Sequence, residues 1–384
     1  MNTLEWLSRL IAFDTTSHNS NMELIDCAKD WFASHDMSTR ITKHPTEAKA
    51  NLFATLPAHN GDLNGGIILS GHTDVVPVDD QQWDTNPFSA AEKDGRIYGR
   101  GACDMKGFLA VALALVPAFH KLKLSQPLHF ALSYDEEVGC LGAPLIIADL
   151  QAAGIKPSAC IVGEPTDMRP VIAHKGIQSF RCRVHGQAAH SSLTPQACNA
   201  IEYAAQLICH IRSIADDLRT TGPFDEYFDV PFTSISSNKI HGGIANNIVP
   251  EHCEFFFEFR HLPSVKPKII IDRINTYVRD HLLPRMQHEH ATAEINIDHL
   301  ASVPSFESLA ASSVTELARK ISGDRNIHKV AYATEAGLFQ QAQIPTIVCG
   351  PGSIEQAHRA NEFVTIEQLR KCEDFLRAMV RACA

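Results

Sequence analysis

The chain has 384 residues, of which 45% are hydrophobic, so it is long enough for two or three domains and has ample apolar material for a core. Its 34 basic and 44 acidic residues give a net charge of −10, which argues against a nucleic-acid-binding surface. The longest apolar stretch, residues 108–119, is too short to cross a bilayer. The eleven cysteines include no CxxC pair and indicate reduced thiols in a cytoplasmic protein.

The first part of the chain alternates between helix and strand patterns. The pattern predicts helices over residues 4–13, 22–32, 106–122 and 142–152, and strands over residues 51–56, 66–70, 127–133 and 158–162. Residues 75–94 are polar, aromatic and proline-bearing, which is typical of a loop that walls an active site. The alternation predicts an α/β domain in which helices flank a central sheet.

After residue 175 the pattern changes. Strand-like alternation over residues 178–184, 232–237 and 251–260 is interleaved with helical patterns over residues 197–218 and 265–283. This mixture predicts an α+β insert with an antiparallel sheet, which we place at residues 176–289, between catalytic-domain segments 1–175 and 290–384. Residues 293–297 are expected to return the chain to the first domain.

Polar clusters follow the apolar runs of the α/β part. Five candidate ligands lie at the strand ends or in the loops just beyond them, namely His72, Asp104, Glu137, Glu164 and His358. Because the carboxyl ends of strands in open α/β sheets converge on one crevice, these side chains are expected to meet there. Two imidazoles and three carboxylates suit zinc or a neighbouring divalent metal. Five ligands exceed the need of one catalytic ion, and a carboxylate shared by two ions would explain the surplus.

The adjacent pair Glu136 and Glu137 has a logic of its own. Successive side chains of an extended chain point in opposite directions. One carboxylate can therefore bind metal while its neighbour accepts a proton from water, although a solvated acidic pair is the simpler alternative for these two residues alone.

Together these residues resemble the metal-dependent family of acetylornithine deacetylases, succinyl-diaminopimelate desuccinylases and aminoacylases. The hallmarks are Ser70-Gly71-His72-Thr73-Asp74, Gly99-Arg100-Gly101 through Asp104-Met105-Lys106-Gly107, Asp135-Glu136-Glu137, Gly163-Glu164-Pro165-Thr166 and a late His358. The resemblance covers nearly the whole chain in order. It implies a zinc-exopeptidase-like catalytic domain with a central mixed sheet, and an inserted lid domain that commonly mediates homodimer formation.

The resemblance implies two zinc ions, with Co2+ as a possible substitute. His72, Asp104 and Glu164 would bind one ion. Asp104, Glu137 and His358 would bind the other, so that Asp104 bridges the pair.

Further roles are implied around the ions. Asp74 would orient its neighbour His72, and Glu136 would be the general base. The peptide bond that follows Asp104 is expected to be cis. In the insert, His190 would reach into the partner subunit's active site and stabilise the oxyanion, whereas on its own a histidine there would be a turn residue.

Substrate-binding residues follow from the same resemblance. Asn247, before Ile248-Val249-Pro250, and Arg260 resemble the lid elements that hold the substrate carboxylate, which suits the bidentate fork of arginine. Gly352 lies in what looks like a loop of backbone donors over the substrate. A proline that the family often has shortly after the late histidine is absent after His358.

The substrate is predicted from two segments. Residues 350–358 and the Thr334-Glu335-Ala336 segment are similar to acetylornithine deacetylases, whereas desuccinylases tend to have a Gly-Thr-Ser-Asp-Gly type segment. We therefore expect hydrolysis of N2-acetyl-L-ornithine to ornithine and acetate, in arginine biosynthesis, by a protein without nucleic-acid or membrane partners. Glu335 would contact the substrate's distal ammonium, or would simply be a carboxylate at a helix N-terminus.

Other functions remain open at this point. A desuccinylase, a general N-acyl amino-acid deacylase or a carboxypeptidase would use the same site. A non-catalytic binding protein on this scaffold would be expected to have lost a metal ligand or the base, and this sequence retains all of them.

Overall fold

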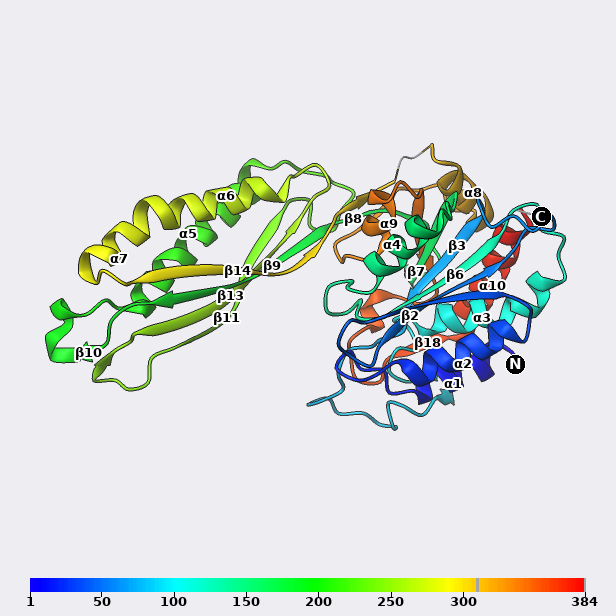
Figure 1. The fold of residues 1–384 in the computed structure, drawn as a ribbon, viewed down its shortest axis with the longest axis horizontal. Helices are drawn as coiled ribbons and strands as arrows, with labels where there is room; N and C mark the ends of the chain where they lie inside the picture. Colours follow the sequence, from blue (N-terminus) through cyan, green and yellow to red (C-terminus); the bar gives the residue numbers. More distant parts are fainter. Residues whose placement is uncertain (309–310, 383–384) are drawn as a thin grey trace. The chain divides into compact units, whose positions relative to one another are not determined.

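The structure, a computed structural model, describes residues 1–308 and 311–382, and these form two compact units (Figure 1). The first unit comprises Met1–Ala173, Phe306–His328 and Thr334–Ala384. The second comprises His174–Ser305 and Lys329–Ala333.

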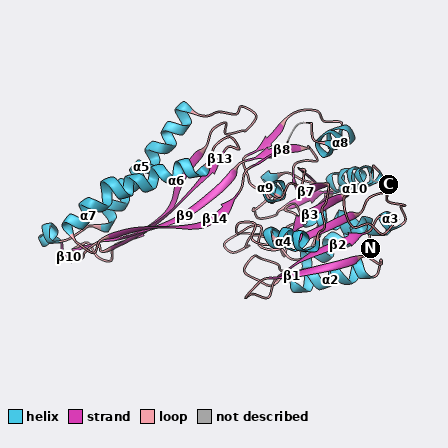
Figure 2. Cartoon of the chain, turned by 45° about the horizontal axis from the view of Figure 1, so that its top comes forward, coloured by secondary structure: helices cyan, strands magenta, loops and turns pink. Residues whose placement is uncertain are grey.

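The first unit is a sheet with helices on both faces (Figure 2). Its helices are α1 (Thr3–Ala12), α2 (Met22–Ala33), α3 (Lys106–His120), α4 (Ala143–Ala153), α8 (Ser313–Ser322), α9 (Ala336–Gln341) and α10 (Ile366–Arg381). The strands of the main sheet are β1 (Ser38–Lys43), β2 (Ala50–Leu56), β3 (Ile67–His72), β6 (Leu128–Ser133), β7 (Ala159–Pro165), β8 (Val171–His174), β15 (Phe306–Glu307), β16 (His328–Val330) and β17 (Thr346–Gly350). The boundary between the units falls within β8, after Ala173, and within β16, after His328. A small separate sheet contains β4 (Ala91–Lys93), β5 (Arg96–Tyr98) and β18 (Phe363–Thr365).

The main sheet is mixed, as predicted. Within the described ranges its nine strands have the order β1-β2-β6-β3-β7-β17-β8-β15, with β16 paired to β8. Strands β6, β3, β7 and β17 are parallel neighbours, whereas β2 runs antiparallel to β6. Parallel strands require crossover connections, which α3 and α4 supply between β3, β6 and β7. The four polar clusters of the sequence therefore follow four adjacent strands that end at the same edge.

Helix α3 is apolar around most of its circumference, and it is accordingly buried. It packs against β3 and β7. Gly163 in β7 permits this approach, because a Cβ atom there would come within 2.0 to 2.3 Å of ring atoms of Phe108. The N-terminal end of α3, directly after Asp104 and Met105, is thereby held close to β3, where Gly71 faces the Met105 side chain.

The hydrophobic core of the first unit lies on the face of the sheet that α3 covers. Helices α1, α2, α8 and α10 contribute to this core, and α4 and α9 pack against the sheet and each other on the other face (Figure 1). Phe32 of α2, for example, lies 5.0 Å from Phe130 of β6, measured between ring centroids.

The second unit is an antiparallel sheet with helices on one face (Figure 2). The sheet order is β11-β13-β9-β14, and a two-stranded ribbon joins β10 to β12. The strands are β9 (Gly176–His185), β10 (Ala189–His190), β11 (Ser234–Gly242), β12 (Ile248–Val249), β13 (His252–His261) and β14 (Glu294–Val303). The helices are α5 (Ala200–Thr221), α6 (Pro267–Tyr277) and α7 (Leu283–Glu289), with a π-helical turn, Val278–Leu282, between the last two.

One predicted boundary of the insert is wrong. Residues 293–297 were expected in the first domain, but β14 pairs antiparallel with β9 over Glu294↔His185 to Val303↔Ile177. The second unit therefore continues to Ser305 instead of ending at residue 289, and it also takes in Lys329–Ala333.

The cysteines and the helices of the described residues bear on two features predicted from composition. Ten cysteines of the described residues are free thiols, and Cys383 lies outside those residues. Among the described helices, none combines the length and apolarity needed to cross a membrane.

Candidate metal centre and catalytic residues

The parallel strands of the first unit deliver the predicted ligands to one place. His72 is the last residue of β3, and Glu164 lies in β7. Glu137 follows β6 after a turn, and His358 lies beyond β17. Ligand atoms of His72, Asp104 and Glu137 lie within 4.8 Å of one another, as do those of His72, Glu136 and Glu164. These two overlapping groups share the His72 imidazole.

Asp104 stands between the two histidines. Its Oδ1 lies 3.0 Å from Nε2 of His72, and its Oδ2 lies 3.2 Å from Nε2 of His358. On the far side, His72 Nε2 is 3.7 Å from Glu164, and His358 Nε2 is 3.1 Å from Glu137. The two oxygens of Asp104 therefore face different imidazoles, and each imidazole also faces a second carboxylate.

Asp74 holds both His72 and the turn that carries the acidic pair. His72 Nδ1 lies 2.9 Å from the backbone oxygen of Asp74, which can only accept, so Nδ1 bears the proton and Nε2 faces the carboxylates. The Asp74 carboxylate accepts the backbone N–H groups of Glu136 (3.1 Å) and Glu137 (3.2 Å), and the Ser17 hydroxyl (2.8 Å). One buried carboxylate thus fixes the positions of a proposed ligand and of the proposed base.

The titration behaviour of the cluster reflects crowded negative charge. Burial, followed by the charge of Asp104, raises the pKa of Glu137 to about 7. The same two causes raise the pKa of Glu164 well above its usual range, and burial raises that of Glu136. For His358, hydrogen bonds to Asp104 and Glu137 raise the pKa to about 10. Carboxylates this close resist joint ionisation unless positive charge is near them.

The pKa values of His72 and Asp104, at the centre of the cluster, shift in opposite directions. Burial lowers the pKa of His72, but hydrogen bonds to Asp104 and Asp74 outweigh it and hold the pKa well above its ordinary value. Burial opposes ionisation of Asp104, yet hydrogen bonds from His358 and His72 keep its pKa below the ordinary value.

Glu362 supports the Asp104 loop, a role that the sequence analysis does not assign. Its Oε1 accepts the backbone N–H groups of Cys103 (2.9 Å) and Asp104 (3.0 Å). Its Oε2 accepts the N–H of Gly101 (3.0 Å) and the guanidinium of Arg100 (2.7 Å). Both charged side chains of this ion pair are 1% exposed. The only signal in the sequence is an acidic residue four positions after His358.

A second buried ion pair supports the turn before the acidic pair. Lys49 lies 2.9 Å from both oxygens of Asp135 and 2.7 Å from the backbone oxygen of Ser17. Asp135 has a φ of 53°, in the left-handed region where a side chain is unusual. The Lys49 ammonium therefore helps to hold the backbone conformation that leads into Glu136.

Glu335 and Gly352 occupy places in the first unit that bear on their expected roles. Glu335 is 1% exposed, directly precedes α9, and accepts a hydrogen bond from Ser70 on β3 (3.2 Å). The Gly352 N–H donates to Gln368 (3.3 Å), and its φ of 88° together with a close approach to Cys103 suits glycine alone. The Asp104–Met105 peptide bond is cis, as predicted.

The remaining predicted residues lie in the second unit. His190 is exposed on β10, where its Nδ1 lies 2.8 Å from the Ser192 hydroxyl. Asn247 is exposed just before β12, and Arg260 on β13 is 3.2 Å from Glu258. Each is thus accessible or partly accessible within its own unit.

The chain belongs to a family of metallohydrolases. Residues 68–382 match Peptidase family M20/M25/M40, which confirms the resemblance inferred from the sequence. Among curated relatives, the acetylornithine deacetylase of Shigella sonnei (strain Ss046) is 34% identical over 359 residues, which are 93% of this chain and 90% of that protein.

Solved structures confirm the fold. An M20 family metallo-carboxypeptidase from Sulfolobus solfataricus has a TM-score of 0.78 at 19% identity and covers 99% of both chains. A dinuclear metal-binding peptidase of the M20 family from Bacillus subtilis has a TM-score of 0.67 at 15% identity, over 99% of this chain and 97% of that one. The chain is therefore an M20 hydrolase with the family's mixed α/β fold.

Proposed function

We propose that this hydrolase is a dinuclear zinc deacetylase that converts N2-acetyl-L-ornithine to L-ornithine and acetate in arginine biosynthesis. The observation that carries the proposal is Asp104, whose two oxygens face His72 and His358 separately at 3.0 and 3.2 Å. The similarity to an acetylornithine deacetylase supports the choice of substrate.

The donor set fits two divalent cations. His72, Asp104 and Glu164 would hold one ion, and Asp104, Glu137 and His358 the other. Burial, followed by the charge of Asp104, raises the pKa values of Glu137 and Glu164, and bound cations would stabilise the ionised carboxylates against both effects. Mixed imidazole and carboxylate ligands are typical of catalytic zinc, and Co2+ accepts the same donors.

Glu136 would move the protons. When bound, the ions would polarise the amide carbonyl and acidify a water molecule. Glu136 would take a proton from water and deliver it to the leaving amine. Its side chain accepts only a weak hydrogen bond from the Cys140 thiol (3.3 Å), while its backbone is fixed by Asp74. Burial raises the pKa of Glu136, which makes it a better base near neutral pH.

Residues of the second unit would bind the substrate and the oxyanion. Arg260 and Asn247 hold the α-carboxylate, and His190 of one subunit donates to the oxyanion in the other, a contribution worth about 3 kcal/mol. In the first unit, Gly352 belongs to the loop expected over the substrate, although its own N–H donates to Gln368. The 1% exposure of Glu335 favours a different role from ammonium binding, namely support of β3 through Ser70.

A cytoplasmic homodimer is part of the proposal. Strand β11 lies at the edge of the second unit's sheet and is mostly exposed, and such an edge can pair with another chain. Ile240 in β11 and Ile244 beyond it are 51% and 87% exposed, which a partner subunit would cover. The free thiols of the described residues support a cytoplasmic location.

A side-by-side assay tests the function. Zinc-loaded and chelated protein would be given N-acetylornithine, N-acetylmethionine and N-succinyl-diaminopimelate. We expect zinc-dependent hydrolysis with the highest kcat/KM on N-acetylornithine. Preference for the succinylated substrate or for N-acetylmethionine would replace the substrate assignment by one of the alternatives, and metal-independent or absent turnover of all three would overturn the proposal.

A further inference from the structure

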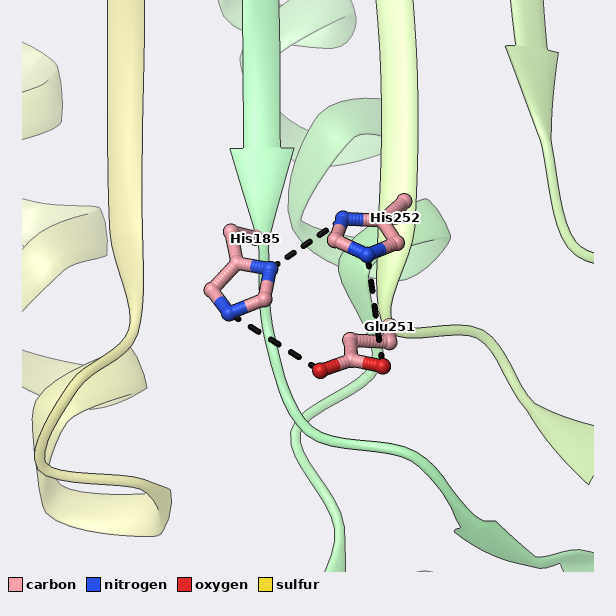
Figure 3. Close-up of side chains that lie close together, drawn as sticks. All are labelled: His185, Glu251 and His252. Carbon is pink, nitrogen blue, oxygen red and sulfur yellow. Dashed lines mark hydrogen bonds and ion pairs between the residues drawn. The ribbon is translucent and has the colours of Figure 1, made fainter.

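Three metal-ligating side chains gather at one end of the second unit's sheet, and the proposed reaction uses none of them (Figure 3). His185 is the last residue of β9, and His252 is the first residue of β13. The two are directly opposite each other in the antiparallel register. Glu251 precedes His252 and turns its carboxylate toward both rings.

The donor atoms are nearly close enough to share one ion. One ligand atom from each of the three side chains lies within 4.8 Å of the ligand atoms of the other two. Glu251 lies 3.8 Å from Nε2 of His185 and 4.0 Å from Nε2 of His252. Donors at zinc bond lengths of about 2.0 to 2.2 Å in a tetrahedral site are about 3.3 Å apart. Small rotations of these three side chains would therefore reach that spacing.

The surroundings offer room and further acidic or imidazole groups. The cluster lines a cavity of about 620 Å³ that is also lined by His241, Glu254 and Glu294. Arg183 is the cation in this lining, and its guanidinium is 2.9 Å from Asp298. The side chain of His252 is 74% exposed, so water can complete the coordination of an ion.

A purely structural explanation accounts for only part of this arrangement. The two imidazole rings lie 4.7 Å apart between centroids, with their planes tilted by 30°, and their Nδ1 atoms are 3.1 Å apart, within hydrogen-bond distance. That pairing leaves the Glu251 carboxylate facing both rings without a hydrogen bond to either, at 3.8 and 4.0 Å. A bound cation would satisfy all three groups at once.

We propose that His185, Glu251 and His252 form a binding site for a divalent transition-metal ion, separate from the M20 metal centre, with Zn2+ as its best-suited occupant. Two imidazoles and a glutamate are a zinc ligand set, and water would fill the remaining position. The site has no ligand in common with the His72 and His358 cluster.

The ion would brace the ribbon that carries His190 and Asn247. In this ribbon Ala189 pairs with Val249, and His190 pairs with Ile248. The Gly186 N–H donates to the backbone oxygen of Glu251 at the base of the same ribbon (2.8 Å). An ion bound by His185 on one side and by Glu251 and His252 on the other would link the two chain segments that lead into the ribbon, and would stiffen it.

Metal counting on the full-length protein tests the site. Wild type and a His185→Ala/His252→Ala variant would be dialysed against Zn2+ and their bound zinc measured by mass spectrometry. The wild type should bind one ion per chain more than the variant. This difference does not depend on how many ions the M20 centre holds or on whether the proposed substrate is cleaved. Equal zinc content would overturn the proposal.

Two controls keep the comparison clean. A His241→Ala variant removes an imidazole from the same cavity and should keep the extra ion; its loss there would overturn the assigned ligand set. A single His252→Ala variant changes a mostly exposed side chain, should unfold in chelator at the wild-type temperature, and should still lose the ion.

Hydrogen exchange of residues 186–192 should slow on zinc addition in wild type only, and unchanged exchange in zinc-bound wild type would overturn the bracing role.

Discussion

Replacing Glu362 with glutamine tests whether one buried carboxylate holds the Asp104 loop in place. The substitution keeps the size of the side chain but replaces one acceptor oxygen by an NH2 group. Oε1 serves Cys103 and Asp104, and Oε2 serves Gly101 and Arg100. Whichever way the new amide is oriented, its NH2 group therefore faces two N–H donors and cannot accept a hydrogen bond from either.

The expected loss of stability is large because the buried donors around Glu362 cannot turn toward water to find other partners. An unsatisfied buried donor costs about 1 to 3 kcal/mol. Removing one partner of a buried ion pair costs about 3 to 5 kcal/mol, and Arg100 is 1% exposed. Since these two effects overlap, we expect Glu362→Gln to lower the free energy of unfolding by about 4 kcal/mol, a large fraction of a typical domain's stability.

Urea unfolding of the chelated protein measures this loss without interference from metal binding. Glu367→Gln is the matched control, because Glu367 is 75% exposed and forms a surface ion pair with Lys371 four residues further on. The control should shift stability by less than about 1 kcal/mol. With metal restored, Glu362→Gln should also bind zinc more weakly, since Asp104 loses a backbone anchor. A Glu362→Gln shift no larger than that of the control would refute the reasoning.

Three further predictions follow from single residues. Glu136→Gln should bind as much zinc as wild type but lower kcat about 10²- to 10⁴-fold, and normal turnover of the metal-loaded variant would rule Glu136 out as the base. Gly163→Ala should lower stability in urea by about 3 kcal/mol, because its Cβ would collide with the Phe108 ring, and an unchanged midpoint would contradict that packing. Burial lowers the pKa of His129 from 6.5 to about 4, so the neutral ring's stability is complete above pH 6.5 and is lost as the pH falls toward 4. The loss should be up to about 3 kcal/mol, and His129→Gln should flatten this part of the stability curve; a slope unchanged by the substitution would show that other groups cause it.

The sequence predicted the sheet edge well because the information there is local. Apolar runs of strand length indicate buried parallel strands. The polar residues at the ends of these runs then lie together where adjacent strands end. His72, Asp104 and Glu137 were brought together by that argument, and the structure places their ligand atoms within 4.8 Å. The strand β1, in contrast, is rich in polar residues and has no apolar run to reveal it.

Long-range pairing accounts for the features that the sequence did not reveal. The alternation in β14 predicts a strand, but only the register with β9 shows to which sheet it belongs. Glu362 supports Asp104 across a separation that no spacing rule covers. In the same way, His185 and His252 become neighbours only once β9 and β13 are aligned.

The chain enters the second unit between β7 and β17, although these strands are neighbours in the sheet. This has a consequence for synthesis. The segment with His72, Asp104, Glu137 and Glu164 leaves the ribosome long before His358 and Glu362, which belong to the last part of the chain. A nascent chain therefore holds all three proposed carboxylate ligands while β7 still lacks its neighbour β17, and contacts of such sequence separation form slowly. We therefore expect metal loading and closure of the sheet to be late events, because they need His358 and β17.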